Sequence, residues 1–478
     1  MSCLFNSYDP YFKQPFGAVR AGQSVRLSLC IPEELGYVDP HLVLQKEGRF
    51  DVPVYYRMNF NGQTPKQNHF SVEVTLNDPG LYFYYFDLYT DFRRIVRGPD
   101  NCGMVSWQDG EKWQITVYDA AFETPESIKG KVFYQIFPDR FCEGVENKPM
   151  PFPDRIYQAD KHAEPFWQPN EVGGHLNEDY FGGDLKGIQL KLPYLHEMGV
   201  DFLYLNPIFE AHSNHRYNTA DYLNVDPLLG EVWEDATTKY GFNQRRTYLL
   251  GKGLDSVMNY PFKNAVLDFV KGKPAEQAAN EILTICEHYP APAMDTALNF
   301  LSTHDTERAL TVIADEPANG RGREWQSGRC VTGDAYEEGL LRLRMAYAII
   351  YTLPGVPCLY YGDEIAMQGY RDPFNRAFFR WDAHEQRLRP VLAQLAQLRH
   401  TCEAFRTGKL NVLRAEGGIL HYQRIGEAET AEIIVNRTEH IIVETLASGK
   451  STEVNPMGFT IVVEEVGHNP NHSYYDYI

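Results

Sequence analysis

The sequence predicts a multidomain protein in which a parallel β/α region lies between two all-β modules. Three observations support this prediction. Residues 1–119 alternate apolar and polar side chains, residues 120–408 repeat a strand–helix–strand pattern, and residues 409–478 return to alternation. A chain of 478 residues is also too long for one ordinary domain.

The first module, residues 1–119, has the period-two pattern of half-buried strands. Two stretches carry apolar residues at alternate positions: Val25, Leu27, Leu29 and Ile31, then Phe70, Val72, Val74 and Leu76. The segment "NDPG" at 77–80 predicts a turn, and the strand "KWQITVYD" closes the region near residue 119. These features predict a β-sandwich.

The middle region, residues 120–408, changes to a parallel pattern. The apolar runs "KVFYQIFPDRF" (131–141) and "GVDFLYLNPIF" (199–209) predict strands, and the helical spacing between them runs through Leu185, Ile188, Leu192 and Leu195. Three further strands are predicted in "GLDSVMNYPF", "ALNFLSTHDT" and "PGVPCLYYGDE". Each ends in a polar cluster, which is where (β/α)8 barrels hold their active sites.

The last module, residues 409–478, follows a predicted helix. That helix has one apolar face, made of Val391, Leu395, Leu398, Cys402 and Phe405, with Gly408 as its cap. Strands then return in "KLNVLRAEGGILHYQRI", "AEIIVN", "HIIVETL" and "FTIVVEEV", with Gly417-Gly418 as a hairpin turn. The chain is thus expected to end in a small β-domain.

Charge and composition exclude several classes of partner. A net charge of -19 argues against nucleic acid, and the most apolar stretch is too broken by prolines to span a membrane. The start lacks a basic segment followed by an apolar run, so we expect no secretory signal and a cytoplasmic location. The eight cysteines show no paired spacing, which predicts reduced thiols rather than a zinc site or a disulfide framework.

Three polar clusters at predicted strand ends could carry chemistry. The first offers His215, Tyr217 and Asp221, the second Glu231 and Glu234, and the third His304, Asp305 and Arg308. Any one of these residues alone is more often solvated or structural than catalytic. Together, on successive strand ends, they predict a cleft lined with carboxylates.

These stretches resemble glycoside hydrolase family 13, the α-amylase family, and within it the neopullulanase, cyclomaltodextrinase and amylopullulanase-like enzymes. The matching motifs, in order, are "FYQIFPDRF", "YFGGDLKGI", "LNPIFEAHSNHRYNTADYLNVDP", "GEVWED", "NFLSTHDT" and "PGVPCLYYGDE". The resemblance implies a (β/α)8 TIM-type barrel with flanking β-domains. It also implies hydrolysis of α-1,4 or α-1,6 glucosidic bonds, or both, in maltooligosaccharides, cyclodextrins or pullulan.

The resemblance implies a role for each matching residue. Glu231 resembles the general acid/base, Asp305 the acid that stabilises the transition state, and His304 a donor to sugar hydroxyls. Tyr217 resembles the ring that stacks on the sugar, and His215 is a further substrate-binding residue. The resemblance makes Ca²⁺ a possible cofactor, because the family often binds it. However, "FCEGVENKPM" is poor in the acidic oxygens that a calcium site requires, so no residue is assigned as a metal ligand. A homodimer through the N-terminal module is also implied.

The chain departs from the family at the motifs of the third and fourth barrel strands. The family's Asn-His motif and its Gly-x-Arg-x-Asp motif, which holds the nucleophilic Asp, are both absent. The loop ending in "DPLLG" runs directly into "GEVWED", so we infer an internal deletion with its join near 229–231, on the order of a hundred residues at about 30 per β/α unit. The predicted barrel is therefore incomplete and lacks strands three and four.

The missing nucleophile leaves three interpretations open. In the first, the natural protein is an active hydrolase and this sequence has lost a segment. In the second, the deletion is real and leaves a catalytically dead maltooligosaccharide-binding or partner protein. In the third, the chain is a relic that folds poorly. Retaining hydrolysis needs carboxyl groups about 5–5.5 Å apart, whereas strands five and seven would anchor Glu231 and Asp305 roughly 10 Å apart. We therefore expect this chain to be inactive.

Overall fold

The computed structural model divides the chain into two compact units, which are described separately. The first comprises Met1–Pro125, Pro227–Val257 and Asn280–Thr296, and the second Glu126–Asp226, Met258–Ala279 and Ala297–Ile478. The boundary falls within helix α4 (Ala275–His288). The structure describes residues 3–47, 53–89, 92–145, 156–168, 177–208, 213–215, 217, 229–230, 240–241, 244–245, 248–251, 253–466 and 473–477.

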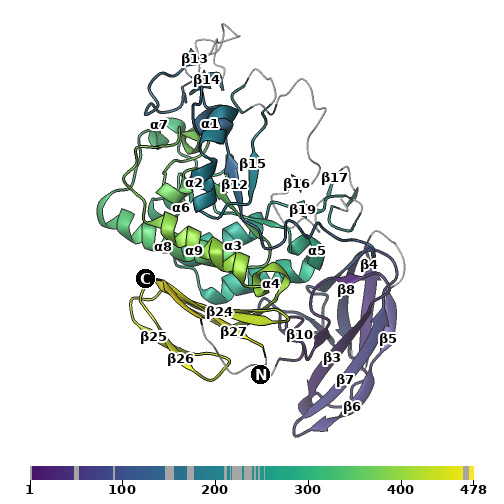
Figure 1. The fold of residues 1–478 in the computed structure, drawn as a ribbon. Helices are drawn as coiled ribbons and strands as arrows, with labels where there is room; N and C mark the ends of the chain where they lie inside the picture. Colours follow the sequence, from purple (N-terminus) through teal and green to yellow (C-terminus); the bar gives the residue numbers. More distant parts are fainter. Residues whose placement is uncertain are drawn as a thin grey trace. The chain divides into compact units, whose positions relative to one another are not determined.

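The first unit contains the predicted β-sandwich, drawn in purple in Figure 1. One sheet has the order β1-β3-β7-β6, and the other has the order β10-β9-β8-β11-β2, with β4 pairing with both β8 and β5. The first sheet consists of β1 (Lys13–Gln14), β3 (Ser24–Pro32), β6 (Asn59–Thr64) and β7 (Gln67–Thr75). The second consists of β2 (Val19–Arg20), β4 (His41–Lys46), β5 (Val54–Arg57), β8 (Gly80–Asp87), β9 (Arg94–Arg97), β10 (Gly103–Ser106) and β11 (Trp113–Tyr118).

The core of the sandwich lies where the alternation predicted it. Strands β3 and β7 pair antiparallel, with Leu27 opposite Val72 and Leu29 opposite Phe70. The predicted apolar positions are all buried: Val25, Leu27, Leu29, Ile31, Phe70, Val72, Val74 and Leu76. Because side chains of a strand alternate between its two faces, this register places one apolar face of the sheet inward.

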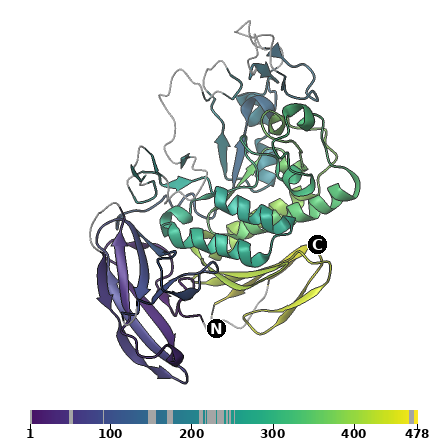
Figure 2. The ribbon, with the colours of Figure 1, turned by 180° about the vertical axis from the view of Figure 1, so that it is seen from behind.

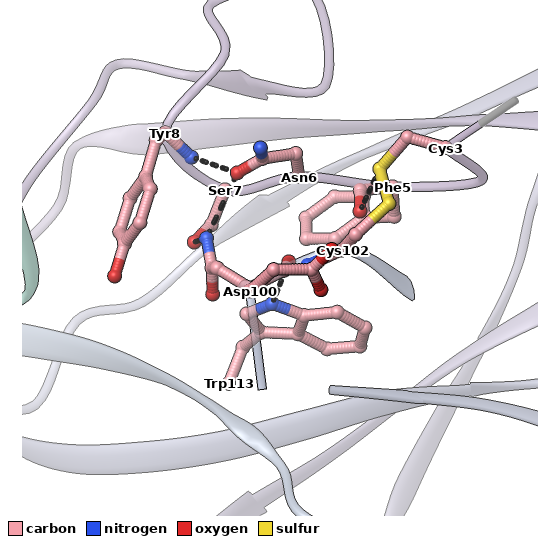
Figure 3. The surroundings of a disulfide bond; sticks show 9 residues. Cys3, Phe5, Asn6, Ser7, Tyr8, Asp100, Cys102 and Trp113 are labelled. Atoms are coloured by element: carbon pink, nitrogen blue, oxygen red, sulfur yellow. Dashed lines mark hydrogen bonds between the residues drawn. A yellow bond between two sulfur atoms is a disulfide. The ribbon is translucent and has the colours of Figure 1, made fainter. Parts of the chain in front are cut away.

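A disulfide between Cys3 and Cys102 joins the start of the chain to the turn before β10 (Figure 3). Around it, Gly103 N donates to Phe5 O at 2.7 Å, and Asn101 Nδ2 donates to Ser7 Oγ at 2.8 Å. The prediction that the cysteines form no disulfide was therefore wrong for this pair. Spacing motifs cannot reveal two cysteines that are 99 residues apart.

The first unit also holds short elements from later in the chain. Strand β16 (Leu229–Gly230) pairs in parallel with β19 (Ser256–Val257), and β17 (Tyr240–Gly241) pairs antiparallel with β18 (Gln244–Arg245). Helix α5 (Ala291–Met294) follows α4. The predicted deletion join near 229–231 coincides with β16, but most residues around it lie outside the described ranges.

The second unit is built on a parallel sheet with the order β15-β12-β21-β20. These strands are β12 (Phe133–Ile136), β15 (Phe202–Leu205), β20 (Leu298–Asn299) and β21 (Val356–Tyr360), and Met258 bridges Leu298 in parallel beyond β20. All residues of β12, β20 and β21 are buried, whereas all four of β15 are only half-buried. Among the described residues, no strand pairs with the free edge of β15.

Helices surround this sheet (Figures 1 and 2). They are α1 (Leu185–Leu190), α2 (Leu192–Glu197), α3 (Tyr260–Lys271), α6 (Ala309–Ala314), α7 (Arg323–Gln326), α8 (Gly333–Thr352), α9 (Leu388–Thr401) and α10 (Ala404–Thr407). The helical spacing predicted through residues 185–195 is divided into α1 and α2, and Leu185 and Leu192 are exposed. Pro193 explains the division, because proline lacks the N–H that a continuous helix would need there.

The predicted C-terminal β-domain is an antiparallel sheet with the order β22-β23-β24-β27-β28, accompanied by the β25-β26 hairpin. Its strands are β22 (Lys409–Glu416), β23 (Ile419–Ile425), β24 (Glu429–Asn436), β25 (Ile442–Thr445), β26 (Ser451–Val454), β27 (Gly458–Glu465) and β28 (Ser473–Tyr477). Gly417-Gly418 forms the predicted turn, whereas Gly408 ends α10 rather than α9. Helix α8 contacts β24 and β27 within the same unit.

One further two-stranded parallel pairing lies in the second unit. Strand β13 (Ile156–Tyr157) pairs in parallel with β14 (Asp179–Tyr180). In the part of the chain that the structure describes, no helix has both the length and the apolarity needed to cross a membrane. The cytoplasmic location, the homodimer and the boundaries of the three predicted domains stay predictions.

Candidate active site

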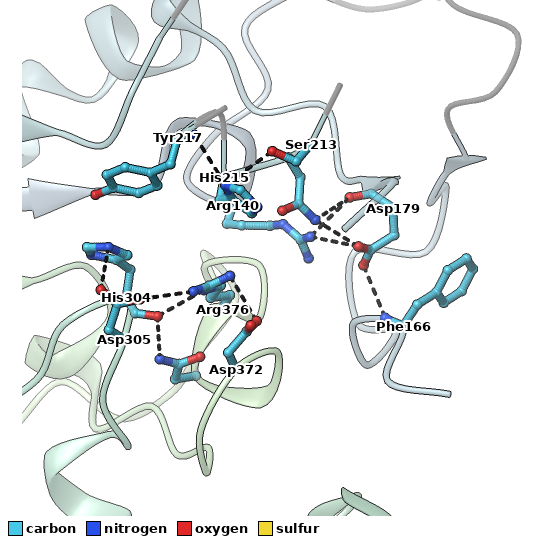
Figure 4. A network of polar contacts seen from close by, with 12 residues as sticks. Arg140, Phe166, Asp179, Ser213, His215, Tyr217, His304, Asp305, Asp372 and Arg376 are labelled. Atoms are coloured by element: carbon cyan, nitrogen blue, oxygen red, sulfur yellow. Dashed lines mark hydrogen bonds and ion pairs between the residues drawn. The ribbon is translucent and has the colours of Figure 1, made fainter. Parts of the chain in front are cut away.

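The carboxyl ends of the parallel strands bring together three of the predicted site residues, all within the second unit. Tyr217 comes from the segment after β15, and His304 and Asp305 follow β20 (Figure 4). Because parallel strands end at the same edge of a sheet, residues far apart in sequence meet there. His215 lies beside Tyr217, with the two ring centroids 6.0 Å apart.

Tyr217 and His304 form a stacked pair of rings. Their centroids are 5.1 Å apart and their planes differ by 13°. Asn206, directly after β15, donates to the Tyr217 hydroxyl at 3.2 Å. Tyr217 is still 41% exposed. The ring is therefore held in a fixed orientation by its neighbours while part of it faces solvent. Such an arrangement provides a flat apolar surface next to polar groups.

A hydrogen-bonded chain continues from His304 to Arg376. Gln135 Nε2 lies 2.9 Å from His304 Nδ1, and His304 Nε2 lies 2.9 Å from an oxygen of Asp305. Since a side-chain amide nitrogen only donates, His304 Nδ1 accepts here and Nε2–H donates to Asp305. Arg376 contacts the other Asp305 oxygen at 3.3 Å. The Asp305 carboxylate is thereby held by two donors and is still 30% exposed.

The loop that carries His304 and Asp305 is fixed by its backbone. Asn375 Nδ2 donates to the carbonyl oxygens of Thr303, His304 and Thr306 at 3.2, 2.8 and 2.8 Å. Arg376 Nε donates to the His304 carbonyl at 2.9 Å. Because both residues lie about 70 positions later in the chain, sequence spacing gave no sign of this support.

The segment that carries His215 and Tyr217 is fixed by a buried ionic group. Arg140 pairs with Asp179 at 3.2 Å, and Asn214 Nδ2 donates to the same carboxylate at 2.9 Å. His215 Nδ1 lies 3.1 Å from Ser213 Oγ. Burial, and then the nearby Arg376 charge, lower the pKa of His215 below its ordinary value. His215 is therefore neutral at pH 7.

Gln135, Asn206 and Arg376 were not predicted from the sequence, and Arg308 does not lie where it was predicted. Gln135 is a buried polar residue inside an apolar strand, and that contrast was the available signal. Arg308, expected in the polar cleft, is 0% exposed and pairs with Asp363 in the interior. Asp221, Glu231 and Glu234 lie outside the described residues.

Within the described ranges of the chain, the oxygen atoms near the "FCEGVENKPM" segment do not fit a calcium ion. Among the described residues, no group of three or more His, Cys, Asp or Glu side chains is arranged to hold a metal. Where the carboxylate of Glu143 and the carbonyl oxygen of Phe181 converge, the ammonium of Lys161 contacts both, at 3.0 Å from Glu143. Lys161 also donates to the Tyr157 hydroxyl at 2.8 Å. An internal cation thus occupies the position that offers oxygen ligands.

We expect EDTA to leave the midpoint of thermal unfolding unchanged. We expect Lys161→Met to lower the free energy of unfolding by about 1–3 kcal/mol, since the substitution leaves acceptors unpaired. Differential scanning calorimetry would measure both effects. Lys273→Met is the control, because Lys273 forms a largely exposed ion pair with Asp268. A midpoint that falls with EDTA and recovers with Ca²⁺ would contradict this reading.

Comparison with known families gives a match in two parts. The model of the alpha-amylase catalytic domain matches residues 135–238 and 228–407, so the two matches overlap at 228–238. An amylopullulanase of Thermoanaerobacter thermohydrosulfuricus is 25% identical over 614 residues, covering 88% of this chain and 40% of that protein. A cyclomaltodextrinase of Geobacillus thermopakistaniensis is 25% identical over 459 residues, covering 66% of this chain and 70% of that protein.

Solved structures share the fold. The type III pullulan hydrolase from Thermococcus kodakarensis is 18% identical, covers 96% of this chain and 99% of that chain, and superposes with a TM-score of 0.57. A cyclomaltodextrinase covers 93% of both chains with a TM-score of 0.56. The present chain spans less than half the length of the amylopullulanases that it matches.

Proposed function

The chain belongs to the α-amylase family of glycoside hydrolases, in its neopullulanase, cyclomaltodextrinase and amylopullulanase-like branch, and from that membership we propose that it carries an α-glucan-binding site without a complete catalytic pair. The ligand would be a maltooligosaccharide or a cyclodextrin. The observation that carries the proposal is the Tyr217 ring, stacked on His304 beside the Asp305 carboxylate.

This arrangement has the chemistry that a glucose ring needs. A sugar presents an apolar face of C–H groups and a rim of hydroxyls. The part-exposed ring of Tyr217 suits the face, and the Asp305 carboxylate suits the hydroxyls as an acceptor. His215, neutral at pH 7, would add a second polar contact. Because Asn206 and Gln135 fix Tyr217 and His304, little side-chain freedom would be lost on binding.

Catalytic roles follow from family membership and are proposals here. Glu231 would be the general acid/base, on the basis of "GEVWED", and Asp305 would stabilise the positive charge of the transition state. The nucleophile has no counterpart, because the Gly-x-Arg-x-Asp motif is absent from the sequence. Without it no covalent glycosyl-enzyme can form, and the retaining mechanism stops.

Three observations support an internal deletion as the reason why the nucleophile motif is absent. The two parts of the family match overlap at 228–238, where the inferred join lies. The alignment with the Thermoanaerobacter amylopullulanase, at 614 residues, is longer than the whole 478-residue chain, so more than a hundred residues of that relative have no counterpart here. Strand β15, the predicted neighbour of the missing third strand, is half-buried at every position. Buried barrel strands normally have partners on both sides.

We expect Tyr217→Ala to weaken maltoheptaose binding roughly tenfold, since it removes the stacking surface, and Asp305→Asn to weaken it as well. Isothermal titration calorimetry with maltoheptaose and with α-cyclodextrin would measure these changes. Tyr37→Ala is the matched control, because Tyr37 is 80% exposed in the N-terminal module. Unchanged binding by Tyr217→Ala, or no binding by the parent chain, would refute the proposed site.

We expect the purified 478-residue chain to release no more sugar from maltoheptaose than its Glu231→Gln variant. Turnover that Glu231→Gln abolishes would mean that another carboxylate serves as nucleophile and would contradict the proposal. Turnover that survives the substitution would point to a contaminant. Intact mass of the protein from its natural source separates a real deletion, near 54.9 kDa, from a longer parent that is a working hydrolase.

A further inference from the structure

A pocket of about 560 Å³ lies in the second unit, and its lining shares no residue with the candidate active site. Its walls come from α2, from the segment that follows Phe378, and from α9. The lining includes Lys191, Tyr194, Glu197, Phe379, Trp381 and Arg389. The volume falls in the range of small-molecule sites, roughly 300–1,000 Å³.

The charge of this pocket is opposite to that of the protein. The chain carries a net charge of -19, yet the lining contains three cations, Lys191, Arg380 and Arg389, against one carboxylate, Glu197. A concave site lined by one sign of charge concentrates the potential inside it. The local chemistry therefore favours an anion, although the rest of the protein repels anions.

The aromatic residues of the pocket hold these cations in place. Lys191 Nζ lies 3.8 Å from the centre of the Trp381 ring, and the Arg389 guanidinium lies 4.2 Å from the centre of the Tyr194 ring. The Phe379 ring packs against Trp381 at 4.1 Å. With cations lying over them, these aromatic surfaces are poor platforms for a neutral sugar.

Both rings are themselves anchored. Trp381 Nε1 donates to Phe141 O at 2.7 Å, and the Tyr194 hydroxyl donates to a carboxylate oxygen of Glu364 at 2.9 Å. Burial, and then the Glu364 charge, raise the pKa of Tyr194 far above its ordinary value, so it remains a neutral donor. The walls of the pocket are thus preorganised around the cations.

Some donors in the pocket lack acceptors, although Arg389 Nη1 donates to Gln386 Oε1 at 3.1 Å. Across the described residues, Lys191 Nζ makes no hydrogen bond or ion pair beyond its contact with the Trp381 ring. Arg389 Nε is buried without a hydrogen-bond partner, and its Nη2 is 3.5 Å from Glu197, longer than a strong charge-assisted bond. A buried unpaired donor costs free energy, and the oxygens of a phosphate group would relieve that cost.

We propose that this pocket binds a phosphorylated sugar, with its phosphate group held by Lys191 and Arg389. The pocket is larger than an inorganic ion requires, which leaves room for the sugar ring next to the polar side chains of Arg380 and Gln386. This site is distinct from the proposed α-glucan site, since the two share no residue. Its ligand class is anionic, whereas the ligands proposed for the first site are neutral.

The test is isothermal titration of the full chain with glucose 6-phosphate, inorganic phosphate and glucose at low ionic strength. We expect glucose 6-phosphate to bind and glucose to bind at least tenfold more weakly, because glucose cannot make the charge-assisted bonds. Phosphate binding as tightly as glucose 6-phosphate would support the anion site with free phosphate as its ligand. Equal affinity for glucose and glucose 6-phosphate would overturn the proposal.

Three variants test which residues bind the phosphate. Lys191→Met keeps an apolar stem over Trp381 and removes the charge, so affinity for glucose 6-phosphate should fall about tenfold. Glu197→Gln removes the one carboxylate and should raise affinity, an effect that a damaged fold would not produce. Lys186→Met is the control, because Lys186 is exposed and donates to Gln189 outside the pocket. Unchanged affinity in both Lys191→Met and Glu197→Gln would overturn the assignment.

Discussion

Replacing Arg308 by methionine is expected to lower the free energy of unfolding by about 3–5 kcal/mol. Arg308 is 0% exposed and lies 3.1 Å from Asp363, which is 2% exposed. Its guanidinium also donates to the Asn375 carbonyl at 3.0 Å and stacks over Tyr360. The substitution would leave a buried carboxylate without this cation. Urea denaturation at pH 7 measures the change.

Two further variants define what the Arg308 result means. Arg387→Met is the matched control, because Arg387 forms an exposed ion pair with Glu337 and should change stability by less than about 1 kcal/mol. Adding Asp363→Asn to Arg308→Met should recover part of the loss, since the uncompensated charge is removed. Equal effects of Arg308→Met and Arg387→Met would show that the buried pair contributes no more than a surface one.

Glu364→Gln is expected to flatten the dependence of stability on pH between about 4.5 and 7. Burial raises the pKa of Glu364 from 4.5 to about 7, against the opposing effect of hydrogen bonds from Tyr134 and Tyr194. Since the folded state keeps a proton that the unfolded state loses in this window, the free energy of unfolding falls as pH rises. Across this pH window, Glu364 lowers the free energy of unfolding by roughly 3 kcal/mol in total, at 1.36 kcal/mol per pKa unit.

The measurement for Glu364 is a series of urea titrations from pH 4 to pH 8 for the parent chain and the variant. Glutamine is neutral at every pH, so the slope contributed by residue 364 should vanish while other groups keep theirs. Glu416→Gln is the control, because Glu416 is an exposed residue of the C-terminal sheet that pairs with Arg414. Parallel pH profiles of the parent chain and Glu364→Gln would contradict the raised pKa.

Strands such as β3, β7, β12 and β21 could be predicted, because burial imposes a periodicity that the residues display. The predicted apolar positions are buried as their spacing indicated: Val25, Leu27, Leu29 and Ile31 in the sandwich, and Val391, Leu395, Leu398, Cys402 and Phe405 in and after α9. The spacing of Leu185 and Leu192 suggested one continuous helix. Pro193 could have indicated the break between α1 and α2, because proline interrupts a helix. Periodicity shows which side of a helix or strand is apolar. It does not show how much of that side is buried by neighbouring elements.

The site was only partly predictable. His304, Asp305 and Tyr217 were found because polar clusters follow apolar strands, and the structure brings these three together. The same cluster also pointed to Arg308, which is buried, because charge alone does not distinguish a cleft from a buried ion pair. Asn375 and Arg376 were missed, since their partners are carbonyl groups of a distant loop and carbonyls leave no mark on the sequence.

The bond between Cys3 and Cys102 makes the N-terminal module a closed covalent ring. A protease that cuts once anywhere inside this ring cannot release a fragment, because the two halves stay joined through sulfur. A nicked chain would migrate as one species until a reductant is added and as two afterwards. The bond thus gives the sandwich tolerance to a single break in its backbone, a property that the two β-sheets alone could not provide.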